Sequence, residues 1–268
     1  MMVKKLHLLC FAALYLVLCN APAQAEKFAS IIIDDVGNNL EYGRQVIQLP
    51  ATLTIAILPE TSYAKRLARL AHKNNKEIML HLPMQSIEHR RSSPGTLDLH
   101  MTKNAFTKQL LQNLNAVPYI RGVNNHMGSL LTRHPGHMSW LMAALAQRGD
   151  LYFVDSRTSR KSIAEQIATE YKIPNLTRDF FLDPDNNKNT LRTQFDRFIQ
   201  QVNQRGYALA IAHPYPETIK FLRAHLDELR AHGIKLIPVS QLIHTANRLN
   251  TNREDNHVAC TGTACSRL

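Results

Sequence analysis

The sequence predicts an α/β fold, an irregular (β/α) barrel of seven or eight parallel strands. Short runs of apolar, often β-branched residues alternate with helical patterns from residue 31 to about residue 248, and this alternation is typical of a parallel sheet. About seven or more strand–helix units in roughly 220 residues favour a closed or nearly closed barrel over the alternative, a doubly wound open sheet. Polar residues support the same interpretation, because they fall at the ends of the predicted strands.

The first predicted strand covers Ile31 to Ile33 and runs directly into Asp34 and Asp35. Its consecutive β-branched residues indicate burial on both faces. Because neighbouring strand residues point to opposite sides, we expect the two carboxylates to take different roles. The structural alternative is a loop that begins with two solvated Asp residues, or an Asp cap on a helix.

The remaining elements are predicted from the same alternation of patterns. Further strands are predicted at residues 51–58, 77–83, 119–123, 151–155, 175–179, 207–213 and 234–239. Helices are predicted at residues 63–75, 102–115, 135–148, 161–171, 189–205 and 217–232, and a last short helix ends at about residue 248.

Residues 1–25 have the pattern of a secretory signal peptide. Two lysines precede an apolar run from Leu8 to Leu18, and Ala23-Gln24-Ala25 forms an A-x-A cleavage signal before Glu26. The apolar run is too short for a comfortable membrane span. We therefore expect a periplasmic or secreted protein with no transmembrane segment in the mature chain. The second alternative is a lipid anchor on Cys19. It is less favoured because Leu18 precedes this cysteine, where lipoprotein signals need a small residue. The third alternative is an N-terminal membrane anchor that is not cleaved.

The mature chain is predicted to form one barrel domain over residues 26–248, followed by a flexible, polar C-terminal tail over residues 249–268. Cys260 and Cys265 are the two cysteines outside the signal region, and in an oxidising compartment we expect them to form a disulfide. The formal net charge of +11 would favour binding to anionic envelope polymers or membrane surfaces. An equally good explanation is that the charge only keeps the protein soluble. No aromatic-basic motif indicates a nucleic-acid partner.

Six polar residues lie at the carboxyl ends of predicted strands. In a barrel these ends share one mouth, where α/β enzymes keep their active sites. A single histidine at such a place is more often a hydrogen-bonded structural residue, but three of them together with carboxylates are harder to assign to packing. The six residues are Asp34, Asp35, His81, His126, Asp155 and His213.

These residue types favour a catalytic metal site. Neutral imidazoles and a carboxylate are the usual ligands of zinc and similar divalent ions. Two imidazoles and one carboxylate leave coordination positions open for water and substrate. A second carboxylate then serves as a base, and a spare histidine as an acid for the leaving group.

The chain resembles the divergent polysaccharide deacetylases of bacterial envelopes, within the wider class of metal-dependent polysaccharide deacetylases. The resemblance implies a polysaccharide-deacetylase-like barrel, and it rests on an ordered set of motifs rather than on any single one. The motifs are IIIDDVG (31–37), EIMLHLPMQ (77–85), GVNNHMGS (122–129), FVDSRTS (153–159), RDFFLD (178–183) and AIAHP (210–214).

The resemblance implies a role for each position at the metal. Asp34 corresponds to the base and Asp35 to a metal ligand. His81 corresponds to the first histidine of the family's second motif, but Gln85 stands where ordinary deacetylases have a second ligand histidine. His126 is the expected replacement. The resemblance therefore implies that Asp35, His81 and His126 are the ligands of one divalent ion, and zinc is the expected ion.

The remaining catalytic positions are matched more loosely. His213 corresponds to the general acid, and Asp155 to an Asp that orients or tunes the catalytic groups, although no Trp follows Asp155 at the usual distance. The Arg and Pro of the ordinary third motif are absent at their usual place. A His126 held structurally by Asn124 or Asn125 is the alternative to its role as a ligand.

The expected function is removal of N- or O-acetyl groups from an acetylated envelope polysaccharide or oligosaccharide by attack of metal-bound water. The first alternative is a weakly active or inactive barrel that binds envelope glycan or a protein partner, as the altered second and third motifs allow. The second is a metallophosphoesterase, suggested by the pair Asn125-His126 and opposed by the lack of an Asp-x-His start motif.

Export is a testable expectation of the N-terminal pattern. Protein recovered from the periplasmic or secreted fraction should begin at Glu26, because the A-x-A signal ends at Ala25 and signal peptidase cleaves after it. N-terminal sequencing checks this. A chain that begins at Met1 in the cytoplasmic fraction would contradict both export and the expected disulfide.

Overall fold

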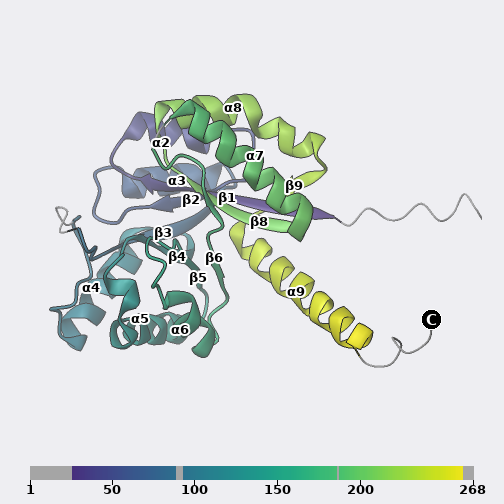
Figure 1. Cartoon of the computed structure of the whole chain (residues 1–268). Coiled ribbons are helices and arrows are strands. Elements are labelled where there is room, and N and C mark those ends of the chain that lie inside the picture. Colours follow the sequence, from purple (N-terminus) through teal and green to yellow (C-terminus); the bar gives the residue numbers. More distant parts are fainter. Residues whose placement is uncertain (1–25, 89–92, 186, 262–268) are drawn as a thin grey trace, which may run out of the picture.

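The computed structural model describes residues 26–88, 93–185 and 187–261, and side chains as far as residue 251 within these ranges (Figure 1). The predicted signal peptide, with the alternative anchor at Cys19, lies outside the described residues. So does Cys265, so the expected disulfide stays a prediction. None of the described helices combines the length and the apolar character that a membrane span requires.

The described strands form one parallel sheet of nine strands in the order β6-β5-β4-β3-β2-β1-β8-β7, with β9 also paired to β1. Because this order follows the chain around a curved sheet, the predicted irregular (β/α) barrel is confirmed. The strands are β1 (Lys27–Val36), β2 (Thr54–Ile57), β3 (Glu77–Met84), β4 (Ile120–Met127), β5 (Tyr152–Asp155), β6 (Asn175–Thr177), β7 (Phe180–Phe181), β8 (Tyr207–Ala212) and β9 (Ile234–Leu236).

One extended segment joins the two ends of the sheet. β6 pairs with β5 and β7 pairs with β8, and only Arg178 and Asp179 separate the two short strands. The backbone N–H of Arg178 donates to the carbonyl of Asp155 at 3.0 Å, and that of Asp179 donates to Leu209 at 2.9 Å. The segment therefore changes partner midway and bridges the gap that would otherwise remain between β5 and β8.

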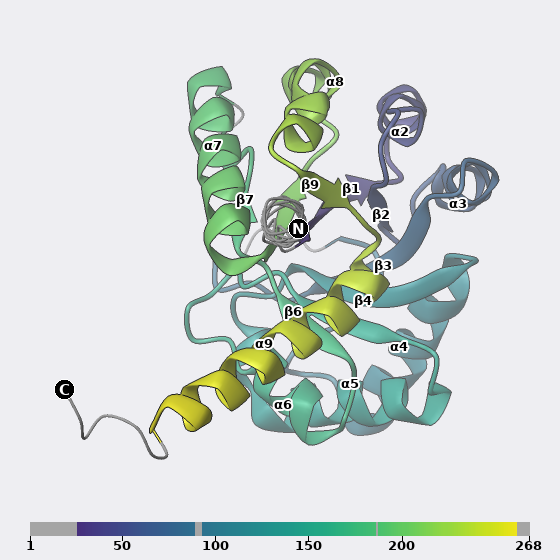
Figure 2. The ribbon, with the colours of Figure 1, turned by 90° about the vertical axis from the view of Figure 1, so that its right-hand side faces the viewer.

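Helices pack on the outer face of the sheet (Figures 1 and 2). Their apolar faces and the outward-facing strand residues form the larger core cluster. The helices are α2 (Leu40–Ile47), α3 (Ala64–Lys73), α4 (Lys103–Ala116), α5 (Pro135–Arg148), α6 (Ala164–Glu170), α7 (Lys188–Arg205), α8 (Pro216–Ala231) and α9 (Val239–Thr261).

Most predicted helices are confirmed within a few residues, and their ends follow from local chemistry. The Thr102 hydroxyl accepts a hydrogen bond from the backbone of Ala105 and so caps α4. Gly149 ends α5 in the left-handed conformation, φ 76°. Helix α2 is not predicted from the sequence, because it is only eight residues long and contains Gly43.

The interior of the barrel is a separate, smaller core. Alternate strand residues point inward, and they include Ile32, Met79, Val154 and Ile211, which pack with the apolar face of α9. Helix α9 lies across the amino ends of the strands (Figure 2), and the hydroxyl of Thr54 accepts a hydrogen bond from the first backbone N–H of this helix at 3.3 Å. The mouth at the carboxyl ends is therefore the open end of the barrel.

The predicted end of the last helix, near Arg248, is wrong. Helix α9 continues to Thr261 and projects beyond the barrel (Figure 1). The stretch from Val239 to Thr261 contains neither Gly nor Pro, so no residue in it interrupts helical hydrogen bonding despite its polarity.

Gly122 gives a test of the interior packing. It pairs with Tyr152 across β4 and β5, and a Cβ at this position would lie 2.2 Å from the Tyr152 ring. Gly122→Ala should lower the free energy of unfolding by about 1–3 kcal/mol, because the ring must move within a packed core. Chemical denaturation measures this. Gly136→Ala is the matched control, since no atom lies within 4 Å of its added Cβ. Equal stabilities of the two variants would contradict the packing argument.

Candidate metal centre

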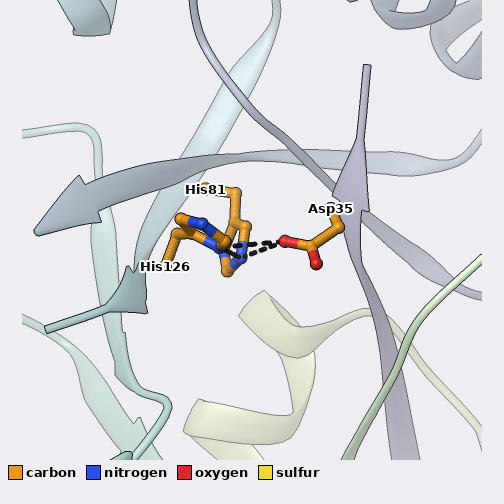
Figure 3. Close-up of side chains that lie close together, drawn as sticks. All are labelled: Asp35, His81 and His126. Carbon is orange, nitrogen blue, oxygen red and sulfur yellow. Dashed lines mark hydrogen bonds and ion pairs between the residues drawn. The ribbon is translucent and has the colours of Figure 1, made fainter. Parts of the chain in front are cut away.

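Three polar side chains converge at the carboxyl ends of β1, β3 and β4. The distances are 3.1 Å from Asp35 Oδ1 to His81 Nε2, 2.9 Å from Asp35 Oδ1 to His126 Nδ1, and 3.1 Å between the two nitrogens (Figure 3). The three atoms thus form a nearly equilateral triangle. Tetrahedral zinc with bonds of about 2.0–2.1 Å separates its ligand atoms by roughly 3.3 Å, so the triangle is close to the size that such an ion needs.

The local backbone of β1 brings Asp35 into this triangle. The pairing register between β1 and β2 shifts between Ile33 and Val36, and Asp35 adopts the left-handed conformation with φ 56°. This irregularity corrects the expectation that Asp34 and Asp35 point to opposite sides. Asp34 Oδ1 lies 3.6 Å from Nδ1 of His81, while Asp35 Oδ1 lies 3.1 Å from Nε2 of the same ring. Both carboxylates therefore face one imidazole.

Asn124 determines which nitrogen of His81 carries the proton. Its side-chain NH2 donates to Asp34 Oδ1 at 2.8 Å, and its carbonyl oxygen lies 2.8 Å from His81 Nδ1. Because an ionised carboxylate only accepts hydrogen bonds, the amide has one orientation, and Nδ1 of His81 must be the donor. In the neutral ring, the lone pair of Nε2 then points toward Asp35 and His126, as a metal ligand requires.

The donor set fits a divalent cation. Asp35 Oδ1 is buried and receives no well-aligned hydrogen bond from the described residues, although two ring nitrogens lie beside it. Burial alone would raise the pKa of Asp35, but His126 and His81 hold it well below its usual range. Burial would lower the pKa of His81, but the charges of Asp34 and Asp35 raise it. Both shifts show that the site favours positive charge. The structure therefore brings the predicted ligands together, and their binding of a metal remains a prediction.

Asp34 is placed to act as a base beside this triangle. Its side chain is buried, and its Oδ2 receives no hydrogen bond from the described residues. Burial raises the pKa of Asp34, and the neighbouring His81, His213 and Asn124 only partly offset this effect. A carboxylate with a raised pKa holds a proton more firmly, which favours general-base chemistry.

His213 is held by Asp183, a residue to which the sequence analysis gave no role. His213 follows β8, and its ring Nδ1 lies 2.9 Å from Asp183 Oδ1. The other carboxylate oxygen accepts the backbone N–H of His213 at 2.7 Å and the Thr218 hydroxyl at 2.8 Å. Burial would lower the pKa of His213, but Asp183, Asp34 and Asp35 raise it to about 9. His213 is therefore protonated at neutral pH and able to donate from Nε2.

Asp155 contacts its own loop rather than the other predicted site residues. Its carboxylate accepts hydrogen bonds from the backbone of Arg157 at 2.7 Å and from the Ser162 hydroxyl at 2.7 Å. Arg178 bonds the same loop, since its Nε donates to the carbonyl of Ser156 at 2.8 Å. These contacts give Asp155 a loop-organising position at the mouth, and its expected tuning of the catalytic groups stays a prediction.

Gln85 anchors a loop instead of facing the metal triangle. Its side-chain oxygen accepts the backbone N–H of Leu99 at 2.9 Å, and its backbone bonds Leu97, Leu130 and Leu131. His126, on the neighbouring strand, instead places its Nδ1 2.9 Å from Asp35 Oδ1. The other ring nitrogen of His126 lies 3.5 Å from the hydroxyl of Ser93, which leaves Nδ1 directed at Asp35.

Residues 31–243 match the family described as divergent polysaccharide deacetylase. The chain belongs to this family. The uncharacterized protein YibQ of Escherichia coli K12 is similar to this chain, being 34% identical over 238 residues, which cover 89% of this chain and 73% of YibQ. The resemblance drawn from the sequence motifs is thus confirmed.

Solved structures support the fold of this member of the family. An uncharacterized protein from Agrobacterium tumefaciens C58 superposes with a TM-score of 0.78 at 20% identity, covering 82% of this chain and 90% of that one. The peptidoglycan deacetylase PdaC from Bacillus subtilis matches with a TM-score of 0.50 at 15% identity, covering 89% and 98%. At these identities the likeness establishes the polysaccharide-deacetylase type of barrel.

The Asp183–His213 pair predicts a specific titration. The pKa of His213 in the folded protein, about 9, lies above its usual value of about 6.5. The pairing therefore stabilises the fold fully below about pH 6.5, and this stabilisation is lost as pH rises through about 9. NMR titration of the imidazole measures the pKa directly.

Asp183→Asn should shift this titration to lower pH, because burial then acts without the opposing charge of Asp183. Asp150→Asn is the control, since Asp150 pairs with Arg148 outside the site. An unchanged His213 titration in Asp183→Asn would show that Asp183 does not set the pKa.

Proposed function

We propose that this protein is an exported, metal-dependent deacetylase that removes N- or O-acetyl groups from an acetylated envelope glycan. The observation that carries the proposal is the triangle of Asp35, His81 and His126, with ligand atoms 2.9–3.1 Å apart, flanked by a candidate base and a candidate acid. The family description supports acetylated polysaccharide as the substrate class. The N-terminal signal pattern supports export.

Asp35 Oδ1, His81 Nε2 and His126 Nδ1 would hold the ion, with zinc as the expected metal. When bound, a divalent ion supplies Lewis-acid polarisation of the acyl carbonyl and stabilisation of the charge that develops on its oxygen. The hydrogen bond from His81 Nδ1 to Asn124 orients the ring for this task, as outer partners of metal-bound histidines commonly do.

The protein's own groups move the protons. Asp34 takes a proton from the attacking water through Oδ2, and its raised pKa makes the carboxylate a stronger base. His213, protonated because Asp183 raises its pKa, donates a proton to the departing amine or alcohol. The two groups thus suit opposite proton transfers, one as base and one as acid, as a single reaction that needs both requires.

Metal content and acetate release together test the proposal. The mature protein should contain about one divalent ion per chain and release acetate from at least one member of a panel of acetylated glycans. His126→Ala should lower metal content and activity together, because it removes a ligand. Asp34→Asn should keep the metal and reduce the rate by roughly 10²- to 10⁴-fold, the usual contribution of a general base.

Exposed His72 on α3 provides the matched control, and His72→Ala should retain both metal and activity. A protein that binds glycan but contains no divalent ion would instead be a binding barrel. A metal-loaded protein that releases no acetate from any panel member would contradict the deacetylase assignment.

A further inference from the structure

Tyr215 presents an exposed aromatic ring directly beside the proposed acid. Its ring centroid lies 5.3 Å from that of His213, with 27° between the ring planes. The residue is 37% exposed, among the most exposed large hydrophobic residues of the described chain. The ring therefore packs beside His213 at the mouth of the barrel, while more than a third of the residue stays open to solvent.

The backbone holds Tyr215 rigidly in this position. Pro214 precedes it and Pro216 follows it, and a following proline restricts a residue to extended conformations. The observed dihedrals, φ −75° and ψ 146°, are of that kind. The carbonyl of Tyr215 also accepts the backbone N–H of Ile219 at 2.9 Å, in the first turn of α8. The ring is therefore preorganised before any ligand binds.

Further planar groups pack against His213. The ring of Phe181 lies 5.9 Å from the His213 ring at 25°, and the guanidinium of Arg178 lies 3.7 Å above the centroid of Phe181. With Asp183 fixing Nδ1, the histidine has little freedom to tilt. Tyr215 consequently packs on a histidine that is itself held in place, so its exposed surface has a defined position relative to the reacting groups.

The chemistry of this outer surface suits a sugar. The Tyr215 hydroxyl has no hydrogen-bond partner among the described residues. A tyrosine combines an apolar ring with a polar tip, and its two side-chain dihedrals make contact area available at a low entropic cost. A pyranose ring offers a complementary combination, with an apolar face of C–H groups and hydroxyls around its edge.

We propose that Tyr215 is a sugar-binding platform that packs against a pyranose ring of the glycan and fixes the acetyl group relative to the metal centre and His213. This assignment rests on the proposed function, and it adds a subsite for the sugar itself to the groups that carry out the chemistry. Tyr215 then determines selectivity for acetylated sugars over acetyl compounds without a sugar ring.

Two substrates separate this role from simple support of His213. Kinetics of the metal-loaded protein are measured with an acetylated chitotetraose and with 4-nitrophenyl acetate, which has no sugar ring. Tyr215→Ala should raise KM for the tetrasaccharide by roughly 3- to 10-fold, as expected for loss of one aromatic contact, and should leave KM for the small ester unchanged. Tyr215→Phe, which keeps the ring, should retain most of the selectivity.

Tyr171→Ala is the matched control. Tyr171 is also 37% exposed, but it follows α6 and leads into β6, at the opposite end of the barrel from the mouth. This variant should leave both substrates unaffected. Equal losses for the two substrates in Tyr215→Ala would overturn the platform, because they would show that Tyr215 acts only on His213.

Calorimetry of tetrasaccharide binding distinguishes failure of the platform from failure of the proposed reaction. If the wild-type protein binds the tetrasaccharide without releasing acetate, the proposed function fails, and weaker binding by Tyr215→Ala still supports the platform. Equal affinities of the wild type and Tyr215→Ala, or no detectable binding by either, would overturn the inference.

Discussion

Asn124 donates a hydrogen bond to Asp34 and accepts one from His81 through the two ends of a single amide. These bonds join β1, β3 and β4 at the mouth of the barrel. They determine the tautomer of His81, and thereby the direction of the lone pair that faces Asp35. Asp34 lies beside Nδ1 of the same ring, while Asp35 lies beside Nε2. The distinction between a candidate base and a candidate ligand in two adjacent, chemically identical residues thus depends on a neutral side chain from another strand.

The two carboxylates reach one imidazole at a cost in backbone geometry. A left-handed conformation costs an ordinary residue roughly 1–2 kcal/mol, and Asp35 adopts it at the register shift of β1. Met127, directly after His126, is also left-handed with φ 54°. Asp tolerates this conformation better than most residues, since its short side chain bonds locally. The surrounding pairs of β1 with β2 and β8 hold the irregular turn in place.

The sequence was sufficient to predict the barrel and the convergence of Asp35, His81 and His126, because parallel strands bring their carboxyl ends to one face and the pattern of apolar runs locates those ends. It was insufficient where single residues depart from regular geometry. Strand alternation could not reveal the bulge that turns Asp34 and Asp35 toward the same ring. Asn124 and Asp183 lie inside the quoted motifs, but their roles depend on side-chain contacts 43 and 30 residues away in sequence. An Asp directly after the apolar run Phe180–Leu182 was the available signal for Asp183.

The position of β1 in the sheet has a consequence for the order of folding. This strand lies between β2 and β8 and also pairs with β9, so its partners come from both ends of the barrel sequence. During vectorial synthesis, the strand that carries Asp34 and Asp35 is made first but lacks one whole side of its hydrogen bonds until residues 207–212 have been added. Such long-range closure slows folding. The centre is therefore a property of the nearly complete chain, and an amino-terminal fragment that contains Asp35, His81 and His126 would still lack the strand that supports them.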